Sequence, residues 1–398
     1  MDTHWLSVAL NPPRAHGAPL ARATLRAEPE DFIVEEDLGF APSGNGQHVL
    51  LKVRKRNANT PWVARELARL CDCHPRDVGY AGLKDRRAIA VQWLTVPKSK
   101  LPLESWREVR HPEFDVLEAH PHSRKLPRGA LAGNRFTIRI RDISVTAAAH
   151  TAESAAAKAA TGSGHPATTA DASATAATPA DASPLTLTAF TTALAARIAA
   201  ISQQGVPNYF GPQRFGRDGA NLTRIADDPS SLRPPERGFV LSAARSLIFN
   251  AVLAERVTDA SWDRLEPGDI ANLDGRGSIF PVDTVDPTLT DRCAKLDIHP
   301  TGPQWGRIVP ATHGRIGELE TRVAAAYPDA CALVTHAGMD QERRALRLAV
   351  RDLTCDYEPN TITLCFRLTR GSFATTVLRE LIDSYTLTAL EPGDSNEV

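Results

Sequence analysis

The sequence predicts an α+β protein, because two kinds of hydrophobic spacing occupy separate stretches of the chain. Apolar and polar residues alternate along 47–56 and 135–141, which is the period of a half-buried strand. Apolar residues three or four positions apart mark 187–201 and 239–256 as helices that face a core. Further strands are predicted at 32–34, 89–96, 343–351 and 361–368, with Arg347 and Arg351 on a basic face of the third of these. Shorter helices are predicted at 60–70, with Thr60 as N-cap, and after Ser372.

The composition is that of a globular chain with ample material for a core. Hydrophobic residues make up 42% and charged residues 23% of the 398 residues, which suggests about two to three domains. No uninterrupted apolar run reaches the roughly 18 residues of a membrane-spanning helix, and the first residues lack the pattern of a signal peptide. Six scattered cysteines fit a reducing compartment. We therefore expect a cytoplasmic protein without a membrane anchor.

The charge is unevenly distributed along the chain. The net charge is −1, yet residues 47–142 hold 20 lysines and arginines against 10 aspartates and glutamates, a local net charge of +10. Such a basic sector is typical of a protein that holds a polyanion at one place. The alternative is that acidic neighbours in the fold balance the sector. The count alone leaves both open.

The stretch 79–97 places a single acid in a basic turn. It begins GYAGLKDRRAIAVQW, so that Asp85 stands beside Lys84, Arg86 and Arg87 and precedes an apolar run. Nearby positive charge favours the ionised form of a carboxylate and can also hold a phosphate, which makes Asp85 a candidate catalytic group. The alternative is an ordinary charged surface turn.

Arginines and aromatic rings gather in two other segments. In 135–141 three arginines share one strand face, which predicts a surface that contacts phosphates. Residues 205–221, GVPNYFGPQRFGRDGAN, combine turn residues, rings, Arg214 and Arg217, a set suited to base stacking and phosphate contact. The alternative for this second segment is a rigid connector whose rings pack inward.

The segment 146–183 differs from the rest of the chain. It is almost entirely Ala, Thr, Ser, Asp, Pro and Gly. Without large apolar residues it buries too little surface to offset the entropy of ordering. We predict a disordered insertion with no catalytic residues.

Familiar cofactor and metal motifs are missing from the sequence. There is no nucleotide-phosphate loop, no G-x-S-x-G, no H-E-x-x-H and no paired C-x-x-C. Cys71-Asp72-Cys73-His74 lacks the spacing of a structural zinc site, so we expect no metal. An acid in a basic turn, arginine-faced strands and an aromatic loop would suit a cofactor-free reaction on nucleic acid. A binding module without chemistry remains the alternative.

The stretch GYAGLKDRRAIAVQW resembles the signature of the TruD-type tRNA pseudouridine synthases. Five other blocks resemble that family in the family's own order: EPEDFIVEEDLGF, RGALAGNRFTIRIR, GVPNYFGPQRFGRDGANL, FVLSAARSLIFNAVLAERV and RGSFATTVLREL. Together the blocks span nearly the whole chain except 146–183 and the extreme ends. One motif would be a weak signal, whereas this many in order is highly specific.

The resemblance implies a pseudouridine-synthase core of mixed, largely antiparallel β-sheet flanked by helices, with a TRUD α/β domain inserted. It divides the chain into a first part of the catalytic core (1–145), a low-complexity disordered insertion (146–184), a core helix (185–204), the inserted TRUD domain (205–342) and the last part of the core (343–398). The implied reaction converts uridine to pseudouridine, at position 13 of tRNA, after the base leaves its stack. It needs no cofactor or metal, and a cytoplasmic monomer is favoured.

The resemblance also implies roles for individual residues. Asp85 is the implied catalytic aspartate, which either attacks the sugar carbon or acts as a base. The implied substrate-binding residues are Phe32, Asn134, Phe136, Phe373, Lys84 and Arg26. For each phenylalanine, ordinary core packing is the alternative. Many relatives carry lysine where this chain has Arg26, which keeps the charge but not the compact ammonium geometry.

Overall fold

The computed structural model describes residues 3–146, 184–227, 232–307 and 312–384. The insertion predicted at 146–184 therefore lies almost wholly outside the described residues. The chain forms two compact units. We call residues 20–195, 351–371 and 382–398 the sheet unit, and residues 1–19, 196–350 and 372–381 the helical unit. The long helix α5 (Pro184–Gln204) runs along the chain from the first into the second.

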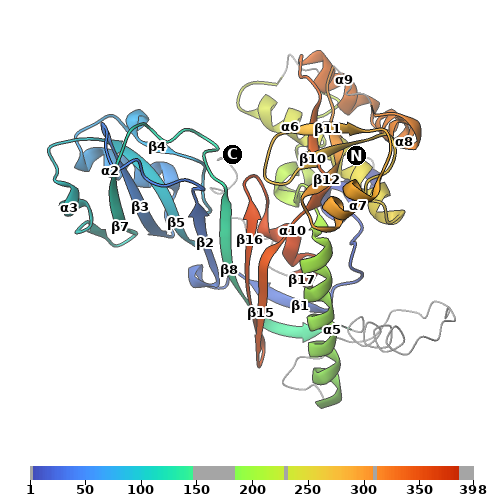
Figure 1. The fold of residues 1–398 in the computed structure, drawn as a ribbon, viewed down its shortest axis with the longest axis horizontal. Helices are drawn as coiled ribbons and strands as arrows, with labels where there is room; N and C mark the ends of the chain where they lie inside the picture. The colour runs from blue at the N-terminus through green and yellow to red at the C-terminus, as the bar shows by residue number, and fades with distance from the viewer. Residues whose placement is uncertain (1–2, 147–183, 228–231, 308–311, 385–398) are drawn as a thin grey trace. The chain divides into compact units, whose positions relative to one another are not determined.

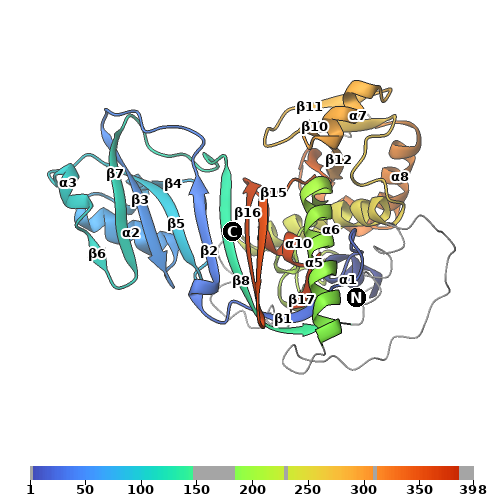
Figure 2. The same ribbon diagram turned by 60° about the horizontal axis from the view of Figure 1, so that its bottom comes forward.

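The sheet unit is built on one mixed, largely antiparallel sheet (Figure 1; Figure 2). The strand order is β15-β16-β8-β2-β5-β3-β7-β6, while β1 joins β8, β17 joins β1 and β4 joins β5. The pairs β2–β5 and β1–β17 are parallel and the others antiparallel. The elements are β1 Ala21–Leu25, β2 Phe32–Asp37, β3 His48–Arg56, α2 Thr60–Leu70, β4 Gly79–Tyr80, β5 Ile89–Pro97, α3 Leu103–Trp106, β6 Arg110–His111, β7 Phe114–His122, β8 Gly133–Val145, β15 Arg351–Glu358, β16 Thr361–Thr369 and β17 Ile382–Ser384. The predicted mixed sheet with flanking helices is confirmed.

The alternation predicted for 47–56 is confirmed by the two faces of β3. Val49, Leu51 and Val53 pack with the apolar face of α2 in one buried cluster. Leu50 points to the opposite face, where it packs in a second cluster with Ala81. The strand is therefore covered on both faces, and β5 beside it lies in the middle of the sheet.

The single strand predicted at 343–351 is wrong. The chain forms β13 (Glu342–Ala345) and β14 (Arg347–Leu348), and β15 begins only at Arg351. The basic face predicted from Arg347 and Arg351 is wrong for Arg347, which is turned inward, as is the neighbouring Arg343. The side chain of Arg343 is 1% exposed, and Arg347 is 4% exposed. A period-two pattern cannot distinguish an exposed arginine from one that is buried with acceptors.

The helical unit is organised around α6 (Glu236–Thr258), which packs against α1, α8 and α9 in one apolar core. An antiparallel sheet of order β11-β10-β12-β13 and a short β14–β9 pair complete the unit (Figure 1; Figure 2). Its other elements are α1 Thr3–Leu10, β9 Val206–Pro207, β10 Asp269–Leu273, β11 Ile279–Val282, α7 Pro287–Ala294, β12 Ile298–Gln304, α8 Gly314–Ala325, α9 Pro328–His336 and α10 Ala374–Leu378, with the 3₁₀ turns η3 Pro212–Phe215 and η4 Arg217–Gly219.

Among the described residues, α6 is the one helix with the length and composition of a membrane span. It escaped the test for uninterrupted apolar runs because charged residues such as Arg245 break its apolar run. Of its most apolar window, 67% is buried inside the structure. That burial is the pattern of a core helix.

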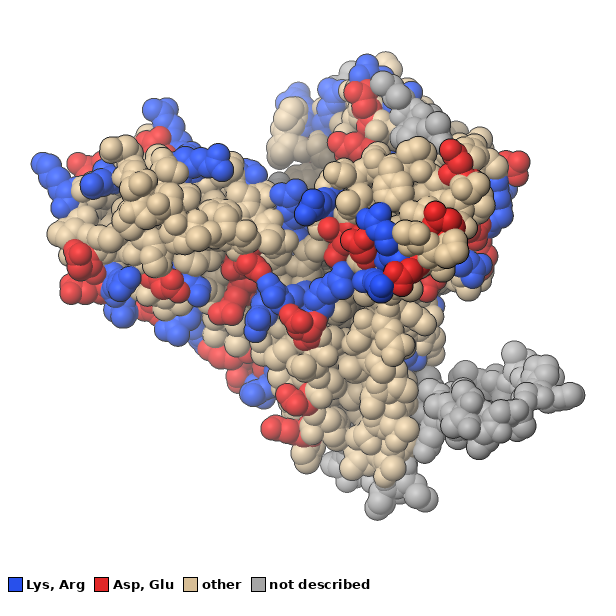
Figure 3. Space-filling view, in the orientation of Figure 1, with Lys and Arg blue, Asp and Glu red and all other residues tan. Residues whose placement is uncertain are grey.

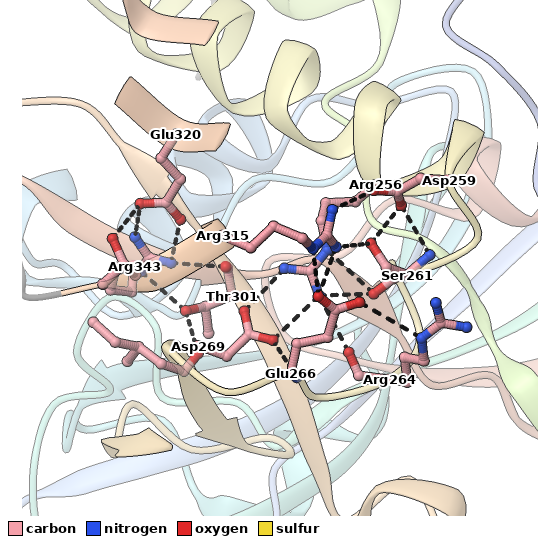
Figure 4. Close-up of polar contacts among 12 residues, drawn as sticks. Arg256, Asp259, Ser261, Arg264, Glu266, Asp269, Thr301, Arg315, Glu320 and Arg343 are labelled. Carbon is pink, nitrogen blue, oxygen red and sulfur yellow. Dashed lines mark hydrogen bonds and ion pairs between the residues drawn. The ribbon is translucent and has the colours of Figure 1, made fainter. Parts of the chain in front are cut away.

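Two buried ion pairs tie helices to strands in the helical unit (Figure 4). Arg256 of α6 contacts Asp269 of β10, with Nη1 and Oδ1 2.9 Å apart. Arg343 of β13 contacts Glu320 of α8, with Nη2 and Oε1 2.7 Å apart. All four side chains are at most 3% exposed. Removing one partner of such a pair leaves a buried charge, at a cost of about 3–5 kcal/mol.

Candidate active site

Asp85 lies in the turn between β4 and β5, and a buried lysine fixes the backbone of that turn. The ammonium group of Lys55, on β3, donates to the carbonyl oxygens of Asp85 at 2.8 Å, Lys84 at 3.3 Å and Ala58 at 2.6 Å. Lys55 is 1% exposed, whereas the side chain of Asp85 is 51% exposed. The turn is therefore held from within while the carboxylate projects outward.

Arg26 reaches the Asp85 carboxylate from the end of β1. Its Nη2 donates to Oδ2 of Asp85 at 2.5 Å. The same guanidinium lies over the ring of Phe32, 4.0 Å from the ring centroid. Arg26 has a φ of +56°, a left-handed conformation that costs a non-glycine residue roughly 1–2 kcal/mol. This backbone bend accompanies a side chain that contacts both the predicted catalytic acid and a predicted pocket residue.

Lys84 joins two strands beside the turn. Its Nζ donates to Oδ1 of Asn134 at 2.8 Å and lies 3.0 Å from Oε1 of Glu36. Glu36 of β2 and Asn134 of β8 face each other across the sheet. The backbone N–H of Trp93 donates to the second carboxylate oxygen of Glu36 at 2.8 Å. Lys84 is therefore held inward by a carboxylate and an amide.

Glu36 is a buried acid whose charge is costly. Its side chain has no exposed surface, and this burial raises the pKa of Glu36. The positive charge of Lys84 and the N–H of Trp93 act in the opposite direction without cancelling the effect. The carboxylate therefore depends on Lys84, just as Lys84 depends on the carboxylate.

A chain of polar contacts behind the turn was not foreseen from the sequence. Asn59, not Thr60, is the N-cap of α2. Thr60 instead donates from its hydroxyl to Gln92 at 2.9 Å and accepts from the N–H of Lys84 at 3.1 Å. Gln92 in turn donates to the carbonyl of Gly82 at 2.6 Å. Both side chains are buried, so the contacts orient the turn from inside.

Two of the unforeseen residues left a signal in the period-two pattern. Glu36 follows Phe32 and Val34 on the buried face of β2, and Lys55 follows Val53 on the buried face of β3. A charged residue that continues an apolar face is expected to be buried and paired. The pattern could therefore indicate that Glu36 and Lys55 are buried, but not which residues they contact.

Phe32 and Phe136 lie together, but as packed rings. Their centroids are 6.0 Å apart at an interplanar angle of 67°, and Phe136 stacks on Phe366 at 5.4 Å. Phe32 is 4% and Phe136 6% exposed. Since Arg26 covers one face of Phe32, a base would stack on that face only after the guanidinium moved aside.

Phe373, the remaining predicted pocket residue, belongs to the helical unit. It precedes α10 and its ring is half-buried against the core around α6. The structure therefore brings five of the predicted residues to Asp85 or to its neighbours within the sheet unit: Arg26, Phe32, Lys84, Asn134 and Phe136. The participation of Phe373 stays a prediction.

The basic sector is partly balanced inside the sheet unit. Lys and Arg side chains lie among Asp and Glu side chains on its visible face (Figure 3). Lys52, Arg54 and Arg56 form ion pairs with acidic side chains of neighbouring elements. On β8, Arg141 is bonded to the buried Asp31, with Nη2 and Oδ1 2.7 Å apart, whereas Arg139 is exposed. Contact of this strand face with phosphates stays a prediction, which the exposed Arg135 and Arg139 support better than Arg141 does.

Comparison with known proteins identifies the family. The family model described as tRNA pseudouridine synthase D (TruD) matches residues 15–167 and 230–381, which is well over half of the chain. The chain belongs to the TruD family. The signature turn with Asp85 lies in the first matched range, and the GSF block lies in the second.

Curated TruD relatives match over almost their full length. The chain is 40% identical over 371 residues to the tRNA pseudouridine synthase D of Nitrosococcus oceani, covering 92% of this chain and 91% of that protein. It is 39% identical over 376 residues to the tRNA pseudouridine synthase D of Methylococcus capsulatus, covering 93% and 94%. The predicted membership of the TruD family is confirmed.

A solved structure supports the fold. It is described as the putative tRNA pseudouridine synthase D (TruD) from Methanosarcina mazei, and it superposes with a TM-score of 0.65 over 94% of this chain and 96% of that one. The sequence identity is 19%, so this likeness concerns the fold alone. The pseudouridine-synthase fold expected of a TruD protein is confirmed.

Proposed function

We propose that the chain isomerises uridine to pseudouridine in tRNA, at position 13, with Asp85 as the catalytic residue. Its membership of the TruD family supports the reaction class. The observation that carries the assignment of the residue is the contact between Arg26 and Asp85 in the signature turn. An exposed carboxylate on a rigidly held turn, touched by one cation, suits a group that must meet a flipped base and its sugar.

The reaction needs a carboxylate and no redox partner. The C1′–N1 bond of uridine breaks, the uracil turns, and a C1′–C5 bond forms. A proton then leaves C5 and N1 gains one, so atoms and electrons balance within the substrate. Asp85 would either attack C1′ or remove a proton while the base is detached, and both roles require its ionised oxygen. Within the described residues Asp85 accepts from Arg26 through Oδ2, and half of its side-chain surface is exposed.

Asn134 is the proposed reader of the uracil edge. Its Oδ1 accepts from Lys84, which turns its amide NH₂ the other way. That NH₂ would donate to a carbonyl of the uracil, and the carboxylate of Glu36 would keep Lys84, and through it the amide, in place. Phe32 and Phe136 would wall the pocket, and Phe373 stays a predicted pocket residue.

We propose that residues 205–342 form the inserted TRUD domain and that the chain on either side of it forms the catalytic core. The helical unit contains all of 205–342 and also takes in 1–19, 196–204, 343–350 and 372–381. Because Asp85 and its contacts come from one chain, a monomer suffices for the proposed chemistry. We propose that the enzyme acts on tRNA in the cytoplasm.

Mapping pseudouridine on an unmodified tRNA transcript tests the proposal. Purified protein should convert uridine 13 and leave the other uridines unchanged. A matched transcript with cytidine at position 13 should gain no pseudouridine while still binding. Binding of the first transcript without product would instead indicate an RNA-binding protein that performs no catalysis.

A further inference from the structure

Two arginines of the helical unit converge on one aromatic ring. The guanidinium carbon of Arg344, on β13, lies 4.3 Å from the ring centroid of Phe210, and that of Arg214, on η3, lies 5.3 Å from it. Both side chains are half-buried, and the ring itself is 6% exposed. Both arginines lie in the helical unit, whereas Asp85 lies in the sheet unit.

The two guanidinium groups lack a carboxylate. Within the described residues neither forms an ion pair, and the hydrogen bonds of both go to neutral oxygens. Burial, and then the charge of Arg214, lower the pKa of Arg344 to about 10, and burial also lowers the pKa of Arg214. A guanidinium group is cationic at neutral pH, so two like charges sit in a half-buried site.

Two other buried arginines of this unit are paired with acids. Arg256 is paired with Asp269 and Arg343 with Glu320 (Figure 4). Arg347 contacts no carboxylate among the residues that the structure describes, but it donates to three backbone carbonyls and to the ring of His299. Arg343 and Arg344 are consecutive on β13. Arg343 contacts an acid, whereas Arg344 contacts none within the described residues.

The uncompensated arginines are held in place. Arg344 donates from Nη2 to Oδ1 of Asn208 at 2.6 Å, and Arg214 donates from Nη1 to Oγ of Ser242 at 2.9 Å. Asn250 fixes Phe210 between them, accepting from its N–H at 2.9 Å and donating to its carbonyl at 3.0 Å. These contacts leave guanidinium N–H groups on both arginines without a protein acceptor in the described chain.

We propose that Arg214 and Arg344 bind phosphates of the RNA backbone, as an anion site within the helical unit. A phosphodiester supplies the missing negative charge and accepts several N–H groups at once. Prior ordering of the guanidinium groups lowers the entropy cost of binding. This proposal rests on the proposed function, because it requires RNA to be the ligand.

Equilibrium binding of tRNA tests the site. The full-length chain would carry Asp85→Asn to prevent turnover, and the dissociation constant would be measured at several salt concentrations. Arg344→Gln and Arg214→Gln should each weaken binding about tenfold. Each should also reduce the slope of log K against log salt by about 0.7–0.9. Arg322→Gln is the matched control, because Arg322 is exposed on α8 of the same unit and is paired with Glu255.

A purely structural role gives a different result. Loss of a packing arginine would lower the melting temperature while tRNA affinity and salt slope stayed at the control values, and this outcome would overturn the proposal. If the two arginines bind phosphate, Arg344→Gln should not lower the melting temperature of the free protein, because the substitution relieves the repulsion between Arg344 and Arg214. If Arg344→Gln does not fold, Arg344→Lys should keep the salt slope and Arg214→Gln should still lose it.

The outcome is separable from the proposed function. With Asp85 intact, the two Gln variants should raise KM about tenfold and leave kcat within about twofold. If the wild-type chain makes pseudouridine and neither variant loses salt slope, the phosphate site is wrong and the reaction stands. If the chain makes no pseudouridine but both variants lose tRNA affinity, the reaction is wrong and the phosphate site stands.

Discussion

The Nη2 atom of Arg26 lies 2.5 Å from Oδ2 of Asp85, and the same guanidinium covers the ring of Phe32 at 4.0 Å. One side chain therefore touches the proposed catalytic acid and a proposed wall of the uridine pocket. The carboxylate is exposed and the ring is buried, so Arg26 is the group between them that substrate must displace or share. Arg26 therefore connects the signature turn to the proposed wall of the pocket.

Replacing Arg26 tests that relationship. Arg26→Gln should slow single-turnover pseudouridine formation by about 100-fold, because the carboxylate loses its only cationic contact in the described structure. Arg26→Lys should recover part of the rate, since it restores a charge without the planar fork. The rate would be measured at saturating enzyme. Equal rates for wild type and Arg26→Gln would show that the contact plays no part in the chemistry.

Glu36→Gln should separate positioning from binding. Without the carboxylate, Lys84 loses its partner and the amide of Asn134 loses its support, so kcat should fall about tenfold. The affinity for tRNA should be unchanged, because the Glu36 side chain has no exposed surface that could contact RNA. Steady-state kinetics and tRNA binding would be compared. A rise in KM at constant kcat would contradict a positioning role.

The same substitution should change how stability depends on pH. Because burial raises the pKa of Glu36, the folded chain holds this proton more tightly than the unfolded chain does. The wild-type free energy of unfolding should therefore fall, relative to Glu36→Gln, as pH rises from the ordinary glutamate value of 4.5 through the raised pKa. Denaturant unfolding of both proteins across that range measures the difference. Parallel curves would mean that the carboxyl group titrates as it does in water.

Arg139 and Arg141 make a matched pair on β8. Arg139 is exposed, so Arg139→Gln should flatten the salt dependence of tRNA binding by about 0.7–0.9 in log–log slope. Arg141 is bonded to the buried Asp31, so Arg141→Gln should lower the melting temperature and leave the slope unchanged. Salt titrations and thermal unfolding of the two variants provide the comparison. The opposite assignment of effects would show that the contact with Asp31 gives way to RNA.

What the sequence could predict follows from what its patterns measure. The alternation in 47–56 and the family signature around Asp85 were sufficient for strand β3 and for the turn that holds the acid. The same alternation, applied to 343–351, missed the division into separate strands. It also assigned Arg347 to an outer face. The spacing of residues shows which face of a strand a side chain lies on, but not whether hydrogen-bond acceptors are buried on that face.

The sequence does not show which residues the site residues contact. Phe32, Val34 and Glu36 share one face of β2, which indicates a buried acid, yet only the pairing of β2 with β8 brings Asn134 opposite it. The contact of Arg26 with Asp85 joins residues 59 positions apart in the chain. Such contacts depend on the strand order of the sheet, and strand order is set by the whole fold rather than by any one segment.

Asp85→Asn tests the central claim most directly. The substitution keeps the size of the side chain and its place on the turn held by Lys55, while removing the ionised oxygen that the chemistry needs. Pseudouridine at position 13 would be measured in single-turnover reactions with an unmodified tRNA transcript. We predict full tRNA binding with no detectable product over the time in which the wild type completes the reaction. Product formation by Asp85→Asn at a rate within about tenfold of the wild type would contradict the account.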